Sequence, residues 1–131
     1  MTPFLITTIE VDEDFISVFS EASHPKHNRG GMLLTDRIDA LNFRLRESAQ
    51  GYSTNFHVAG DPTLIIVQQG TLRVSLQNGD SKDFGAGSMF IAKDYLPPEI
   101  QFDESIHGHK AEVIGEQPLK AVHIKLSSIS G

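Results

Sequence analysis

Cysteine is absent from the 131-residue chain, and this absence excludes three kinds of chemistry at once. Disulfide bonds, thiolate metal ligands and a cysteine nucleophile all need a thiol group that no residue supplies. Basic residues are scarce too: 11 lysines and arginines against 17 acidic residues give a net charge of -6 and an isoelectric point near 5.4. A chain this acidic is a poor partner for nucleic acid or an anionic membrane.

Long apolar segments are also missing. No stretch approaches the roughly 20 consecutive apolar residues that a membrane-spanning helix requires. The first residues, "MTPFLITTIEVDEDF", have no basic start and no apolar stretch of secretory length, and they soon turn acidic. The sequence therefore predicts a cytoplasmic protein.

Short alternating runs, separated by glycine, asparagine, aspartate and proline, are what the chain does contain. In "TLRVSL" the residues Leu72, Val74 and Leu76 alternate with polar ones, and "QNGD" then supplies the Asn-Gly pair of a type I′ hairpin turn. About seven such strands follow residue 40, which predicts an all-β sandwich or barrel. We expect one domain over 1–131, with N-terminal strands and a loop in 1–39 and the barrel core in 40–126.

Three segments fit this pattern less well. The apolar residues of 12–22 have mixed spacing, which predicts either one short helix near the N-terminus or an edge strand. The polar composition of 23–31 predicts a loop. The two prolines within 94–105 predict an extended connection, because proline cannot sit in a central strand.

Two histidines stand two residues apart in "ESIHGHKAEV". Successive side chains of a strand point to opposite faces, so His107 and His109 would share the apolar, inward face with Ala111 and Val113. The sequence therefore places both imidazoles in a pocket.

Glycines and histidines also recur at spacings that point to a fold family. Gly51 precedes His57 by six residues and Gly70 follows in "VQQGTLRV"; Gly87 lies in "DFGAGSMFIAK", after the "NGD" hairpin, and His109 lies in "HGHKAEVIGEQPL". The run from about 57 to 126 thereby resembles the two motifs of the small single-domain cupins, if 94–105 is an insertion. The resemblance implies a double-stranded β-helix, a barrel related to the jelly roll.

The chain departs from the family motifs where the family binds a metal. Ala59 stands where a second histidine is expected, and Thr63 stands where a glutamate is expected. A divalent transition metal (Fe, Mn, Zn or Ni) would therefore depend on His57 and His109 with His107 as third ligand, because open metal sites usually keep three protein ligands. Without a metal, the same pocket is expected to bind a small ligand through His57, Gln68, Tyr52, His107 and His109.

Other candidate residues have simpler explanations. His24 and His27 lie in the polar segment, and the parity of His123 places it outward, so all three are expected at the surface. Arg44 and Arg46 lie opposite the apolar side of "ALNFRLR". They would be solubilising there, or would pair with acids of a second copy if this is an edge strand.

Three functions remain open from the sequence, and whether the chain is an enzyme is undecided. The first is small-molecule binding in the mouth of a cupin barrel, with the histidines as hydrogen-bond donors or an acid–base pair. The second is a metal-dependent oxygenase or isomerase using His57, His107 and His109. The third is a non-catalytic dimeric sensor or partner module. A homodimer is expected in any case.

Overall fold

The computed structural model describes residues 2–127, and within that range it contains strands and no helix. The all-β class predicted from the turns and alternation is confirmed. No helix in this part of the chain is long and apolar enough to cross a membrane. The strands are β1 (Phe4–Val11), β2 (Ser17–His24), β3 (His27–Arg29), β4 (Met32–Leu34), β5 (Ala40–Ser48), β6 (Thr63–Gln69), β7 (Thr71–Leu76), β8 (Ser81–Phe84), β9 (Met89–Ala92), β10 (His109–Ile114) and β11 (Leu119–Leu126).

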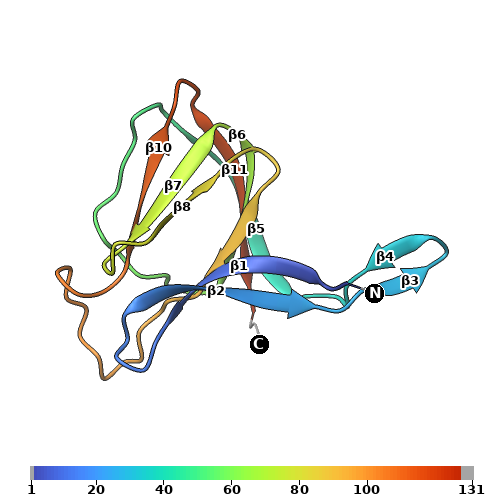
Figure 1. Ribbon diagram of the computed structural model, residues 1–131, viewed down its shortest axis with the longest axis horizontal. Helices are drawn as coiled ribbons and strands as arrows, with labels where there is room; N and C mark the ends of the chain where they lie inside the picture. The colour runs from blue at the N-terminus through green and yellow to red at the C-terminus, as the bar shows by residue number, and fades with distance from the viewer. Residues whose placement is uncertain (1, 128–131) are drawn as a thin grey trace.

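Two sheets form the body of the molecule, and a hairpin projects from it (Figure 1). The larger sheet has six strands in the order β2-β1-β9-β6-β11-β5, and the smaller has three in the order β10-β7-β8. Neighbouring strands pair antiparallel except β1 and β9, which run parallel. This one parallel pairing joins the N-terminal hairpin to the rest of the sheet.

The core lies between the two sheets. Leu72, Val74 and Leu76 are buried on one side of β7 while their neighbours are half-buried, as the alternation predicted. They pack against residues from β6 and β9 of the larger sheet, such as Val67 and Phe90. The inner side of the six-stranded sheet is therefore fixed by its contact with the smaller sheet.

The opposite side of the six-stranded sheet is apolar as well. Strand register aligns two rows of residues across β5, β11, β6 and β9. We call these residues the outer face: they are Phe43, Ile124, Leu64 and Ile91 in one row, and Leu45, Val122, Ile66 and Met89 in the other.

The segments that were ambiguous in the sequence are resolved. The helix considered for 12–22 is not formed: β2 begins at Ser17 and is an edge strand, the alternative prediction. The loop expected over 23–31 is wrong, because β3 and β4 pair here through a turn in which Gly30 and Gly31 both have positive φ. The connection 94–105 contains no strand, as predicted.

Candidate functional site

A cavity of about 280 Å³ lies between the two sheets. Core residues supply its apolar wall, and polar side chains from β5, β11, β10 and the segment 52–57 supply the others. It is lined by Arg46, Tyr52, Thr54, His57, Ile65, Leu72, Val74, Phe90, His109, Ala111 and His123. Apolar pockets with a few convergent polar groups are typical of small-molecule sites.

His57 and His109 stand next to each other on one wall. Their backbones form an isolated antiparallel bridge, with both N–H···O bonds at 2.9 Å, and their ring centroids are 4.5 Å apart. The Nδ1 of His57 lies 2.9 Å from the carbonyl oxygen of Asn55. A carbonyl can only accept, so His57 Nδ1 carries the proton and Nε2 is left as the acceptor of the neutral ring.

Asp94 contacts the Nδ1 side of the His109 ring. The carboxylate is fully buried, and its Oδ2 lies 2.8 Å from His109 Nδ1 and accepts a 2.6 Å hydrogen bond from Ser17 Oγ. Its Oδ1 accepts a hydrogen bond from the backbone N–H of Ala59. Burial by itself would raise the pKa of Asp94, but the hydrogen bond and attraction of His109, with the bonds from Ser17 and Ala59, leave that pKa below its ordinary value. An ionised Asp94 fixes the proton on His109 Nδ1 and leaves Nε2 for the cavity.

The turn before β2 brings Ser17 to this carboxylate. Asp12 Oδ1 accepts hydrogen bonds from the backbone N–H groups of Asp14 and Ile16, at 2.8 and 3.0 Å, and Phe15 adopts a φ of 64°. The side chain of Asp12 therefore closes the turn that places Ser17 beside Asp94.

Arg46 and His123 form the polar part of another wall. Arg46 Nη1 lies 3.3 Å from His123 Nε2, its Nε donates to Ser48 Oγ at 3.0 Å, and its guanidinium lies 5.5 Å from the Tyr52 ring centroid. Burial lowers the pKa of Arg46. The expectation of an outward His123 is wrong, since it lines the cavity. Arg46 likewise lines the cavity from edge strand β5, although sequence alone suggested a solubilising or intersubunit role.

We expect His123 to remain neutral to unusually low pH. Burial, followed by the positive charges of Arg46 and Arg44, lowers its pKa to about 4. The unfolded chain binds this proton near pH 6.5, so His123 makes folding less favourable as the pH falls from about 6.5 to 4. Imidazole NMR titration should show a midpoint near 4 that moves upward in Arg46→Met, and moves less in Arg44→Met. A wild-type midpoint near 6.5 would contradict this assignment.

The residues predicted for the site divide into two groups. Tyr52, His57 and His109 line the cavity, whereas Gln68 and His107 do not. The strand begins at His109, and Gly108 with a φ of 92° ends the expected alternation, so the shared face of "HGH" is wrong. His107 is buried elsewhere: its Nδ1 accepts a hydrogen bond from the Asp103 N–H, and its ring lies 6.1 Å from that of Phe102.

The residues present do not fit a tight mononuclear metal site. Between residues 2 and 127, no three histidine, aspartate or glutamate side chains are grouped so that they could hold a metal ion. His57 and His109 offer neighbouring imidazoles, and Asp94 already binds Nδ1 of the second. His123 Nε2 accepts from Arg46. Two ligands fall short of the three that open metal sites usually keep.

Sequence reasoning missed Ser17, Asp94 and the inward Arg46 and His123. A signal existed for Asp94, which shares the parity of buried Phe90 and Ala92 and so continues the inward side of β9. No local signal marks Ser17, because it is 77 residues from its partner and reaches it through the β1–β2 turn.

Comparison with known proteins gives limited similarity. No family model and no curated protein matches the chain. Among solved structures, a conserved protein of unknown function from Streptococcus pyogenes is 8% identical with a TM-score of 0.46, over 74% of this chain and 72% of the other. A protein from Salmonella typhimurium proposed as ethanolamine utilization protein Q is 14% identical with a TM-score of 0.33, over 98% of both chains. Neither likeness assigns the chain to a family.

Proposed function

We propose that this chain is a cupin-type barrel that binds a small organic anion, such as a carboxylate, in the cavity between its sheets. Arg46 would hold the charged end of the ligand, while Ile65, Leu72 and Phe90 would pack against its apolar part. A cavity of about 280 Å³ suits a small metabolite rather than a polymer.

The observation that carries this proposal is the lack of a counter-ion for Arg46. Its polar contacts are Ser48 Oγ and His123 Nε2, and its ring contact is Tyr52. Within residues 2–127, no carboxylate forms an ion pair with its guanidinium. A half-buried cation with only neutral partners is poorly compensated, because burial costs a charge its hydration. A ligand carboxylate would supply the missing charge, and guanidinium geometry favours a bidentate contact with it.

The surrounding groups fit the same ligand. His123 accepts a hydrogen bond from Arg46, which orients the guanidinium and adds no positive charge while the ring is neutral. The cavity-facing nitrogens of His57 and His109 lie on another wall, so a ligand held by Arg46 would meet them with a different group. Tyr52 covers the guanidinium with its ring.

Matched pairs of ligands test this proposal. Acetate, propionate and benzoate, with their amides as neutral isosteres, would be titrated into the protein and followed by backbone NMR shifts. We expect the acids to perturb cavity residues and the amides not to. Arg46→Met should weaken binding by about tenfold or more, since a hydrogen bond to a charged group contributes about 1.5–3 kcal/mol.

Arg44→Met is the matched control. It removes the same side chain from the same side of β5, two residues away and outside the cavity lining, so binding should be unchanged. Equal binding of acids and amides, or full binding by Arg46→Met, would contradict the choice of an anion. Absence of binding by any probe would contradict the cavity as a site for such ligands.

A second candidate function is proton transfer on the bound ligand, favoured by the buried Asp94 behind His109. A carboxylate that fixes the Nδ1 proton makes Nε2 available to take a proton from the ligand, and it stabilises the imidazolium that results. An epimerase or lyase acting next to the carboxylate of its substrate would use such a base. Its test is exchange of the ligand's α-hydrogen with deuterium in heavy water, which should be lost in His109→Gln while binding persists.

A further inference from the structure

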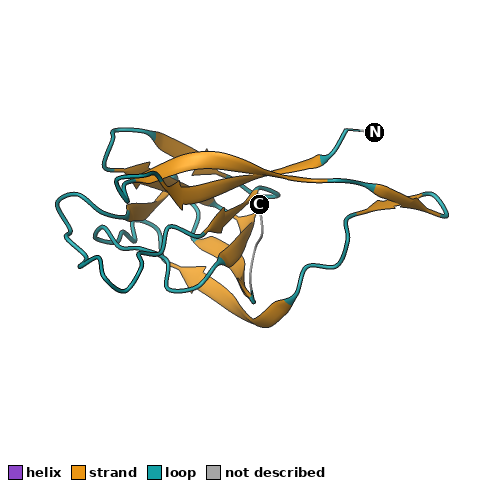
Figure 2. Ribbon diagram, turned by 90° about the horizontal axis from the view of Figure 1, so that it is seen from below, coloured by secondary structure: helices purple, strands orange, loops and turns teal. Residues whose placement is uncertain are grey.

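The β3–β4 hairpin stands away from the body of the protein. We call residues 25–38 the arm. Figures 1 and 2 show it projecting beyond the sheets, joined back to β5 by a long return segment. Every residue of β3 and β4 is exposed, including Met32 at 58%, Leu33 at 42% and Leu34 at 40%. A two-stranded hairpin by itself is at best marginally stable in water, so the arm needs a surface to pack against.

The outer face is the second apolar surface: it is covered at Ile91, which is 1% exposed and packs with Ile6 and Leu126, but it is uncovered where it reaches β5. At its edge, Phe43 and Leu45 are 68% and 77% exposed, and Leu41 beside them is 62% exposed. β5 is also the terminal strand of the six-stranded sheet, with nine residues and an unpaired edge. A long, apolar, exposed edge strand promotes association unless another element covers it.

The total accessible surface area of the chain also indicates that part of it is covered by another molecule. The chain exposes 7940 Å². A compact monomer of 14.4 kDa is expected to expose roughly 6,800 Å². The excess of roughly 1,100 Å² is close to the ~800 Å² that each partner buries in a standard interface.

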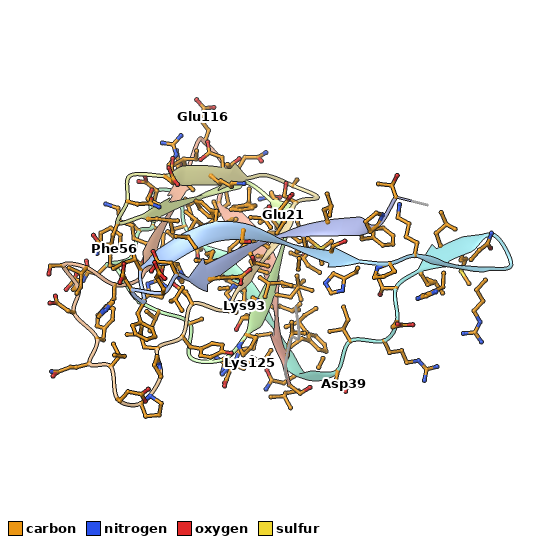
Figure 3. All side chains as sticks on the ribbon, turned by 60° about the horizontal axis from the view of Figure 1, so that its bottom comes forward. Glu21, Asp39, Phe56, Lys93, Glu116 and Lys125 are labelled. Carbon is orange, nitrogen blue, oxygen red and sulfur yellow. The ribbon has the colours of Figure 1, made fainter. Side chains whose placement is uncertain are left out.

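The arm does not cover the outer face of its own chain. Figure 2 shows the arm extending away from the body while the return segment bends back to β5, and the apolar side chains of both the arm and β5 are exposed. Figure 3 shows Asp39 at the end of this return and the arm's side chains spread into solvent. The cover must therefore come from another molecule.

From these observations we infer that the protein forms a symmetric homodimer in which the arm of each copy packs on the outer face of the other around β5. In a two-fold symmetric dimer the contact between the arm of one copy and the β5 region of the other occurs twice. One interface therefore covers both arms and both β5 strands. Charge favours a second copy as the partner. The arm has three basic residues and one acidic, a charge of +2, whereas the rest of the chain carries -8. A basic arm is attracted to an acidic body.

Light scattering coupled to size exclusion tests the assembly. We expect twice the 14.4 kDa chain mass for the wild type. Phe43→Glu with Leu45→Glu should give a folded monomer, as should Met32→Glu with Leu34→Glu in the arm. Ile106→Glu is the control: Ile106 is 47% exposed but lies outside both surfaces, so this variant should remain dimeric. Circular dichroism would establish that each variant is folded.

Cross-linking tests which surfaces meet. Because the chain has no cysteine, a single Leu34→Cys copy mixed with a single Leu45→Cys copy has only the two introduced thiols. Mild oxidation should produce the mixed disulfide dimer, and Ile106→Cys in place of Leu45→Cys should not. A monomeric wild type, or a dimer that survives the β5 substitutions, would overturn the inference. A dimer without the arm-to-β5 disulfide would overturn the arm's place in it.

Discussion

Asp94→Ala is expected to destabilise the protein by about 3–5 kcal/mol, a loss large enough to unfold many domains of this size. The substitution removes the acceptor of three hydrogen bonds, from Ser17 Oγ, His109 Nδ1 and the Ala59 N–H, in a place with no exposed surface. The three donors stay buried without their acceptor, so each keeps a desolvation cost. Urea unfolding followed by circular dichroism measures the change.

Asp94→Asn removes the charge of the side chain but keeps its size and shape. An amide of the same size keeps an acceptor oxygen, so we expect a smaller loss, about 1–2 kcal/mol. The substitution should also remove the contribution of Asp94 to the pH dependence of the free energy of unfolding. The pKa of Asp94 is lower in the folded than in the unfolded chain, so the stabilisation is present above the ordinary aspartate pKa of 3.8 and is lost as the pH falls through the folded value. If Asp94→Ala has the same urea midpoint of unfolding as the wild type, the buried hydrogen bonds of Asp94 do not stabilise the fold.

Gly108→Ala should have the second largest effect, about 3 kcal/mol. A Cβ at this position would lie 2.6 Å from the carbonyl oxygen of His57 and 2.8 and 2.9 Å from two more of its backbone atoms, at a φ of 92°. Backbone cannot rotate aside as a flexible side chain can, so the His57 segment must move and its bridge to His109 must lengthen. Shifts in the imidazole NMR signals of both histidines would accompany the loss of stability.

Gly79→Ala is the matched control. Gly79 has nearly the same φ, 95°, but a Cβ there meets nothing within 4 Å. It isolates the strain of a positive φ, about 1–2 kcal/mol, from the collision. Equal losses in the two variants would show that the contact of Gly108 with His57 does not position the histidines.

The same glycine explains why the sequence predicted only part of the site. Alternation succeeded for β7, where each residue takes an ordinary strand conformation. It failed across "HGH", because the positive φ of Gly108 reverses the expected direction of His107. A conformation available mainly to glycine is not visible in a pattern of apolar and polar letters.

Arg46 illustrates a different limit. Alternation correctly separates Phe43 and Leu45 from Arg44 and Arg46, but it does not reveal which side faces the interior. In β5 the apolar side faces outward, and Arg46 faces the cavity. Polar residues inside and apolar residues outside run against the usual rule of burial, so the apolar–polar pattern of this strand does not show which side is inward.

The parallel contact between β1 and β9 has a consequence for how the protein is made. β1 ends at Val11 and β9 begins at Met89, so synthesis at about 5–20 residues per second separates their emergence by roughly 4–16 s. During that interval the β1–β2 hairpin has no neighbour along the edge that β9 later occupies. The hydrogen bond from Ser17 cannot form until Asp94 has been synthesised, and the bond between Asp94 and His109 cannot form until His109 has been added. The hydrogen-bonded group of Ser17, Asp94 and His109 is therefore assembled late, and a chain truncated before residue 109 lacks this group and also lacks β11, the strand that pairs with the edge of β6.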